Sequence, residues 1–263
     1  MQFLILFIVA LIISAIGFKK FVWFISLGYG FAIAGIGMAI LVLFWGSLTP
    51  VTIVLSILLV IYGCRLGGYL MIREKRSESY QSTMKHEIKD GSDMNLFLKI
   101  VVWVTCALLY VCEASPVLFR LKNGAGTDVT AIVGTFIMIL GILLESASDF
   151  TKNRFKKEHP QRFCDVGLFR IVRCPNYLGE VLIWTGVFVS GVTALQGAWQ
   201  WVAAVFGWVC IIYIMFGGAR RLEIRQNKNY GNDPEYQKYV KSTPILLPLI
   251  PLYSVAKYKW LLG

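Results

Sequence analysis

The chain has 263 residues, of which 57% are hydrophobic and 16% charged, and its mean hydropathy is +0.64. This composition excludes an ordinary soluble globular protein and predicts one polytopic membrane domain over residues 1–263. The net charge of +11 does not indicate nucleic acid, because the basic residues lie between apolar segments, where membrane topology and anionic lipid explain them.

Seven apolar segments have about the length that a bilayer-spanning helix requires. The sequence therefore predicts an all-α fold with spans at residues 2–18, 22–45, 50–72, 95–118, 129–149, 176–196 and 198–217. Pro50, Pro116 and Pro175 are expected at the edges of spans, where a missing amide costs least. The first span lacks the basic leader and cleavage site of a signal peptide and is expected to be retained.

The distribution of positive charge predicts the orientation of the spans. All but four of the 26 Lys and Arg residues fall in residues 19–20, 73–94, 150–175 and 218–263. Because basic loops face the cytoplasm, the N-terminus is expected outside and the C-terminus inside. The three larger segments then share one side and form a cytoplasmic polar cap.

The end of the chain alternates apolar residues with prolines. Pro244, Pro248 and Pro251 interrupt it too often for an ordinary spanning helix. It is expected to lie at the membrane interface, with the aromatic side chains of Tyr253, Tyr258 and Trp260 at the level of the headgroups.

The third span carries polar residues spaced three, four, four and three apart, which places them on one helix face: Tyr62, Arg65, Tyr69, Arg73 and Arg76. Such a face predicts a phosphate-bearing ligand that enters from the cytoplasmic side. The alternative is that Arg73 and Arg76 only extend to the membrane interface and that Tyr62 only packs. That alternative is poor for Arg65, because an arginine inside an apolar run needs a countercharge.

Residues 145–186 contain a second concentration of polar groups. Glu145 and Asp149 could accept hydrogen bonds from a cofactor or could pair with Arg65 or Arg154, and pairing is the safer interpretation. The basic run at 152–162 fits a phosphate site and a solvated loop about equally well. Pro175 can begin a helix whose first turn presents Asn176, Tyr177 and Glu180 on one face, where a helix start favours anions and amide-type ligands.

The remaining polar residues are less informative. Glu113 lies within the fourth span. It could be a structural hydrogen-bonding group or could line a substrate cavity. The six cysteines and two histidines show no metal-ligand spacing, so no metal site is expected.

Four stretches together resemble a known family: RLGGYLMIR at 65–73, LLESASDF at 143–150, GLFRIVRCPNYLGE at 167–180 and DPEYQKYVKSTPILLP at 233–248. In this order they are similar to the membrane-bound steroid 5-alpha-reductase superfamily, and most of all to its bacterial branch of uncharacterised integral membrane proteins. The resemblance implies a seven-helix bundle in a bacterial inner membrane. It also implies NADPH as cofactor and reduction of a carbon–carbon double bond conjugated to a carbonyl, in a steroid-like or other apolar lipid.

The resemblance also implies roles for individual residues. Tyr62 and Glu180 are the expected catalytic residues, and Tyr62 and Glu113 are expected to contact substrate. The residues expected to bind the cofactor are Arg65, Tyr69, Arg73, Arg76, Asp149, Arg154, Lys156, Asp165, Arg173, Asn176, Tyr177, Glu180 and Arg221. The family pairs its tyrosine with a glutamate on the second helix, whereas this chain has no acidic residue before Glu74. Glu113 could take that place if it faces the same cavity.

Two other functions remain open. A membrane methyltransferase of the isoprenylcysteine type, using S-adenosylmethionine, has a similar RHPxYxG motif but usually carries Glu-Glu after the last helix, where this chain has Arg220-Arg221-Leu222-Glu223. A non-catalytic lipid-binding protein of the same fold is the third hypothesis.

Overall fold

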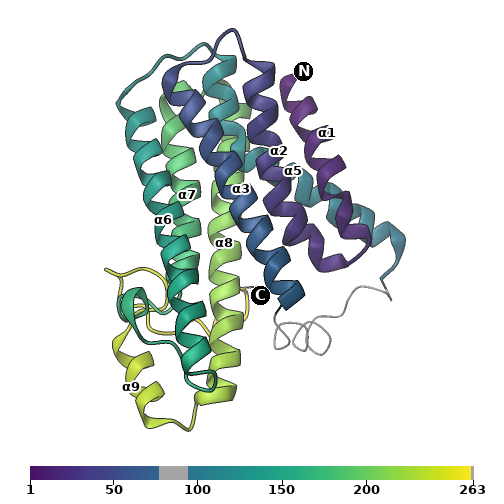
Figure 1. Cartoon of the computed structure of the whole chain (residues 1–263). Coiled ribbons are helices and arrows are strands. Elements are labelled where there is room, and N and C mark those ends of the chain that lie inside the picture. The colour runs from purple at the N-terminus through teal and green to yellow at the C-terminus, as the bar shows by residue number, and fades with distance from the viewer. Residues whose placement is uncertain (77–93, 262–263) are drawn as a thin grey trace. The chain divides into compact units, whose positions relative to one another are not determined.

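The computed structural model describes residues 1–76 and 94–261, and within these ranges it is helical and contains no strand (Figure 1). The α-helices are α1 (Gln2–Ser14), α2 (Leu27–Leu43), α3 (Pro50–Arg76), α5 (Leu96–Lys122), α6 (Val129–Glu158), α7 (Pro175–Gly191), α8 (Gly197–Tyr230) and α9 (Pro234–Ser242). Short 3₁₀ helices are η1 (Ala15–Phe18), η2 (Phe21–Ile25), η3 (Gly167–Arg170) and η4 (Val192–Ala194).

The predicted fold class is confirmed. Six helices of the described chain are long and apolar enough to cross a membrane, and a shorter apolar helix, Gln2–Phe18, precedes them. The protein is therefore an all-α, polytopic integral membrane protein. No helix follows Ser242 in the described residues, which agrees with the expectation that the proline-rich end does not span.

The helix ends differ from the predicted spans where polar sequence continues a helix. α6 and α8 run well beyond the apolar residues, to Glu158 and Tyr230, because Lys, Arg and Glu are good helix formers. Much of the predicted cap is thus helical, and its segment 73–94 lies mostly outside the described residues. Pro116 was expected at a span edge but lies inside α5, as membrane helices tolerate. Pro50 and Pro175 begin α3 and α7 as predicted.

The described chain forms two compact units, Met1–Thr135 with Val187–Trp208, and Phe136–Gly186 with Val209–Gly263. We call them unit 1 and unit 2. The expected single membrane domain stays a prediction. In unit 1, α2 packs against α1, α3 and α5.

Helices α2 and α3 of unit 1 meet backbone to backbone. A Cβ atom on Gly30 would lie 2.7 Å from the amide nitrogen of Gly67, and one on Gly63 would lie 2.5 Å from the amide nitrogen of Ala34. Both distances are too short for any side chain. Glycine at these positions therefore sets how closely the two helices approach, as small residues do in membranes.

A network of polar groups around Arg120 also stabilises unit 1. The guanidinium of Arg120, on α5, is fully buried. It donates to the carbonyl oxygen of Ser190 at 2.7 Å, to that of Gly126, to the Asp128 carboxylate at 3.0 Å and to Thr193 Oγ1 at 2.8 Å. Because a buried charge must be compensated, this network ties α5 to the start of α6 and the end of α7.

In unit 2, α6 and α7 also approach through glycines. A Cβ atom on Gly141 would lie 2.7 Å from the Gly179 carbonyl oxygen, and one on Gly179 would lie 2.8 Å from the amide nitrogen of Glu145. Helix α9 lies beside the C-terminal ends of α6 and α8 (Figure 1), where Phe163 contacts the rings of Tyr236 and Tyr239. The C-terminal segment after α9 packs its apolar side chains onto α7 and α8.

The glycine contact makes a first prediction. Gly63→Ala should destabilise the protein by about 1–3 kcal/mol, because the new methyl group overlaps the α2 backbone. Gly68→Ala, on the same helix, has nothing within 4 Å of its new Cβ and should leave stability unchanged or slightly raised. Thermal unfolding of the two variants in detergent measures the difference, and equal melting temperatures would contradict the close contact.

Asp128, which precedes α6, makes a second prediction. Burial acts to raise its pKa, but four hydrogen bonds to the carboxylate outweigh that effect and hold the pKa well below its ordinary value of 3.8. The donors are Thr193, the Ala131 N–H, Arg120 and Thr130. A lowered pKa adds stability that is complete above the unfolded-state value and is lost as the pH falls through the folded-state value.

Asp128→Asn should therefore lower stability by about 1–2 kcal/mol at pH 7, the usual cost of a damaged helix cap. Its deficit relative to the wild type should be the same at pH 5 and should shrink below pH 4. Melting temperatures measured across this range test the prediction. A deficit that does not change with pH would contradict the ionic role of Asp128.

Candidate functional site

Tyr62 lies at the middle of α3 and its side chain is fully buried. Its hydroxyl donates a hydrogen bond to the hydroxyl of Tyr29, on α2, with 3.1 Å between the two oxygens. The two rings meet edge to face, with centroids 6.3 Å apart. On α2, the hydrogen-bond partner of Tyr62 is thus the phenol of Tyr29, whereas the resemblance implies a glutamate on this helix.

A third tyrosine completes this phenol cluster in unit 1. The ring of Tyr110, on α5, lies 5.0 Å from that of Tyr29. Its hydroxyl donates to the carbonyl oxygen of Phe24 at 2.6 Å, just before α2 begins. Tyr110 therefore fixes the chain just before α2 and packs against the ring of Tyr29. The neighbouring glycines Gly30 and Gly63 bring α2 and α3 together at the same level.

The other polar residues of α3 follow Tyr62 along the helix. Arg65, Tyr69 and Arg73 are half-buried, and the guanidinium of Arg65 lies 6.0 Å from the centre of the Tyr69 ring. Glu74 accepts hydrogen bonds from Lys20 and from the indole N–H of Trp23. The side chain of Arg76 lies outside the described part of the structure.

Glu113 is buried in α5, one helical turn after Tyr110. It belongs to unit 1, as Tyr62 does. Gly207 of α8 packs against the backbone of Cys112 and Glu113, so closely that a Cβ atom on Gly207 would overlap it. Its expected contact with substrate stays a prediction.

The first turn of α7, in unit 2, presents the residues that the motif PNYLGE predicts. The Oδ1 atom of Asn176 is buried and has no hydrogen-bond partner among the described residues. Glu180, one turn later, is buried and accepts a hydrogen bond from the indole N–H of Trp184 at 3.1 Å. An acceptor oxygen without a donor costs free energy, so a ligand N–H at Asn176 would be stabilising.

The glycine of this motif has a structural function. Gly179 lies against the backbone of Glu145, so that α6 places this buried carboxylate beside the first turn of α7. The ring of Tyr177 packs in turn against Gly218 of α8. Three helices therefore meet around the α7 N-terminus, whose positive dipole end favours a ligand acceptor or anion.

Arg173, expected to bind cofactor, lies in a buried ion pair. Its Nη2 donates to Glu223 Oε1 at 2.8 Å and to the carbonyl oxygen of Tyr253. The other Glu223 oxygen accepts the N–H groups of Val255 and Ala256 at 2.8 and 2.9 Å. This pair joins the start of α7, α8 and the C-terminal segment, and the guanidinium is nearly inaccessible to solvent. This geometry gives Arg173 a role in positioning the α7 N-terminus. Its Nε and Nη1 atoms are buried and have no hydrogen-bond partner among the described residues, and the expected contact with a cofactor stays a prediction.

The polar residues at the end of α6 and in the following loop mostly bind one another. Lys156 donates to the carbonyl oxygens of Pro160 and Arg162 and to the Tyr230 hydroxyl, and so closes the loop. Arg162 pairs with Asp165 at 3.0 Å. Of the remaining expected cofactor ligands, Asp149 is half-buried, Arg154 is an exposed partner of Glu158, and Arg221 is exposed on α8.

Cys174 directly precedes Pro175, at the position of the histidine in the RHPxYxG motif. Burial raises the pKa of its thiol to about 12, against the opposing charge of Arg173. The thiol is therefore neutral at physiological pH. It packs in the apolar cluster beneath the C-terminal segment and cannot serve as an acid or base there.

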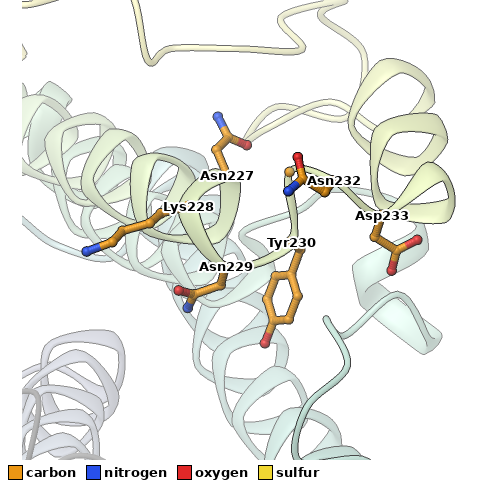
Figure 2. A pocket seen from close by; sticks show the side chains of 7 residues that line it. Asn227, Lys228, Asn229, Tyr230, Asn232 and Asp233 are labelled. Atoms are coloured by element: carbon orange, nitrogen blue, oxygen red, sulfur yellow. The ribbon is translucent and has the colours of Figure 1, made fainter.

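The described chain also has a surface hollow of about 260 Å³ at the turn between α8 and α9, lined by residues 227–233 (Figure 2). Its polar groups already serve the fold. Asn227 accepts a hydrogen bond from Tyr236, and Asp233 caps α9 by accepting the Glu235 N–H. Figure 2 shows the side chains of Lys228 and Asp233 on opposite sides of the turn, so they do not converge on a ligand.

A family model of known sequences matches residues 3–243 of the chain, and its description is "Protein of unknown function (DUF1295)". The curated relatives that match include proteins named as steroid reductases. The chain is 26% identical over 132 residues to the 3-oxo-5-alpha-steroid 4-dehydrogenase 2 of Macaca fascicularis and to that of Homo sapiens, covering 49% of this chain and 46% of each relative. It is 32% identical over 77 residues to the steroid 5-alpha-reductase DET2 of Arabidopsis thaliana, covering 28% of this chain and 27% of that protein.

The chain belongs to the DUF1295 family, within the steroid 5-alpha-reductase superfamily. It spans less than half the length of the curated relatives that it matches. It matches no solved structure.

Three residues of the candidate site were not predicted. Tyr29 stands in a glycine-rich run, and the pair Tyr29-Gly30 repeats the order of Tyr62-Gly63, which is a signal that two helices meet there. Trp184 lies four residues after Glu180 and so shares its helix face. Nothing in the sequence separates Glu223, which holds Arg173, from the other acidic residues near the C-terminus.

The buried ion pair makes a third prediction. Glu223→Gln should destabilise the protein by about 3–5 kcal/mol, because Arg173 stays buried without its countercharge. It should also speed tryptic cleavage at Lys257 and Lys259, since two backbone N–H groups lose a charged acceptor.

The control is Glu235→Gln, which breaks the exposed pair of Glu235 with Arg162 and should cost less than about 1 kcal/mol. Equal melting temperatures and cleavage rates in the two variants would rule out that Glu223 holds Arg173 and the C-terminal segment in place.

Proposed function

We propose that this protein is a membrane-embedded, NADPH-dependent reductase of a carbon–carbon double bond conjugated to a carbonyl, in a steroid-like or other apolar lipid. The names of the curated relatives support the reaction class. The observation that carries the proposal is the buried Oδ1 atom of Asn176, which lacks a donor among the described residues at the start of α7.

The residues around this atom fit the nicotinamide end of the cofactor. A carboxamide offers two N–H donors and one acceptor. Asn176 Oδ1 would accept one of these N–H groups, and Glu180, oriented by Trp184, would accept another. The positive end of the α7 dipole suits the carboxamide oxygen. NADPH would supply the hydride, and these side chains would hold and orient its ring.

Tyr62 has the properties required of the group that polarises the substrate carbonyl. It is a buried phenol in an apolar surrounding, where a hydrogen bond to a developing enolate oxygen is worth most. Arg65, one turn along α3, favours negative charge near the phenol and makes it a better donor. Glu113 is the candidate for contact with the rest of the substrate.

The methyltransferase hypothesis is less well supported. Methyltransferases of this type usually carry Glu-Glu after the last apolar span. Glu223, the acidic residue at that place, is fully occupied by Arg173 and two backbone N–H groups. The methyltransferase function is therefore only an alternative outcome of the experiment below.

The orientation of the protein in the membrane, and the membrane in which it lies, are part of the proposal. The distribution of Lys and Arg supports an N-terminus outside and a C-terminus in the cytoplasm, and the family branch suggests a bacterial inner membrane. Under this orientation the cofactor residues of unit 2 would be reached from the cytoplasm, the apolar substrate would come from the lipid phase, and no partner protein is needed.

The test is thermal unfolding of the detergent-purified protein with NADPH, NADH or S-adenosylmethionine. We expect stabilisation by NADPH, about 2.7 kcal/mol at a hundred times the dissociation constant. In Asn176→Ala the affinity should fall about tenfold, the equivalent of one lost hydrogen bond.

Asn229→Ala, which truncates an exposed asparagine in the hollow of Figure 2, is the matched control and should keep the full effect. Stabilisation by S-adenosylmethionine alone would replace the proposal with the methyltransferase. Unchanged affinity in Asn176→Ala would remove Asn176 from the cofactor site.

A further inference from the structure

In unit 2, the C-terminal segment after α9 returns along α8 towards the apolar part of that helix. The N–H group of Ala256 donates to Glu223 at 2.9 Å, and its carbonyl oxygen accepts from Arg220 at 3.2 Å. Further along the segment, the carbonyl oxygen of Trp260 accepts from the Tyr213 hydroxyl at 2.5 Å. The segment therefore runs antiparallel to α8, from the level of Glu223 to that of Tyr213.

These contacts fix the level of the segment relative to the membrane. Helix α8 has no charged residue before Arg220, so its apolar part ends there. Tyr213 lies two turns earlier, about 10 Å deeper at 1.5 Å per residue. The ring of Trp260 stacks on that of Tyr213, with centroids 6.1 Å apart, and is 65% exposed. An exposed indole at this level contacts lipid, and tryptophan is enriched at the membrane interface.

Two exposed lysines, Lys257 and Lys259, lie between these contacts and therefore at the edge of the apolar part. Neither forms an ion pair with a residue that the structure describes. No acidic residue follows Glu235 in the sequence. Glu223 is buried, and its two oxygens accept from Arg173 and from backbone N–H groups. Positive charge at this level fits the phosphates of anionic lipids.

The same segment has an exposed apolar turn. The N–H group of Ile245 donates to the carbonyl oxygen of Leu252 at 2.8 Å and closes it. At its tip, Leu249 and Ile250 are 95% and 50% exposed, with a proline on either side. Proline has no N–H group to leave without a partner in lipid. The turn therefore suits contact with lipid as well.

We propose that the C-terminal segment is a binding surface for anionic phospholipid. Lys257 and Lys259 bind the phosphate groups, and the ring of Trp260 lies at the start of the acyl chains. The attraction between the two lysines and the lipid holds the segment along α8. The inference goes beyond the proposed function and does not depend on it, because it uses only the membrane location and the contacts within unit 2.

The segment also holds the residues that precede α7. The carbonyl oxygens of Pro244 and Ile245 accept the N–H groups of Arg173 and Cys174 at 2.9 and 3.0 Å. The carbonyl oxygen of Tyr253 accepts from the Arg173 side chain. An anionic lipid that holds the segment therefore also stabilises the start of α7.

The test is hydrogen–deuterium exchange, followed by mass spectrometry, on protein in lipid nanodiscs that hold one copy each. The discs contain phosphatidylcholine alone, or equal parts of phosphatidylcholine and phosphatidylglycerol. Amides in 253–261 should exchange about tenfold more slowly in the anionic discs, because an opening of the segment removes both lysines from the charged surface. The amides of Arg173 and Cys174 should also be slowed, and added sodium chloride should reduce the difference by screening.

The double variant Lys257→Gln/Lys259→Gln should lose the difference between the two lipids. The matched control is Lys238→Gln/Lys241→Gln, which removes the same charge from exposed residues of α9, at the far end of α8 (Figure 1), and should keep it. Inorganic phosphate added to phosphatidylcholine discs should not slow exchange.

Three results would overturn the inference. The first is equal exchange of the wild type in the two lipids, or loss of the difference in both double variants. The second is slowing by inorganic phosphate alone, which would assign the lysines to a soluble anion. The third is slowing in phosphatidylcholine discs that hold two copies, without slowing in anionic discs that hold one, which would assign the surface to a second copy of the chain.

Discussion

Backbone-to-backbone contact between helices at glycine is the constraint on which the candidate site residues depend. In unit 1 the contact joins α2 and α3 at Gly30 and Gly63, and the residue before each glycine is one of the paired tyrosines. In unit 2 it joins α6 and α7 at Gly141 and Gly179. Lipid gives helices no hydrophobic reason to associate, so close packing and buried hydrogen bonds must do so.

The polar groups of this protein divide into two kinds. The hydrogen bonds of Arg120 and the ion pair of Arg173 with Glu223 connect segments far apart in the sequence, which is how structural charges in an apolar interior are compensated. The hydroxyls of Tyr29 and Tyr62 and the amide of Asn176 are neutral polar groups, and the buried Oδ1 atom of Asn176 has no hydrogen-bond partner among the described residues. This contrast is the main physical reason to place chemistry at the second kind and stability at the first.

The basic run at 152–162, which covers the end of α6 and the start of the following loop, shows that composition alone does not identify a ligand site. Its lysines and arginines suit a phosphate site, yet Lys156 is engaged by carbonyl oxygens and a phenol of its own unit. The structure assigns Arg173 a buried partner in the same way. A charge in a sequence indicates a need for compensation, and only the fold decides whether the compensation comes from the chain or from a ligand.

The sequence by itself determined the helical membrane fold, the starts of α3 and α7 at prolines, and the shared faces of Tyr62 with Arg65 and of Asn176 with Glu180. These follow from apolar run length and helical spacing, which are local properties. Only the tertiary structure decided that Tyr29 is the partner of Tyr62 and that Glu223 holds Arg173. Such partners are distant in the sequence, and they meet because of how closely glycine lets helices pack and where the chain turns back.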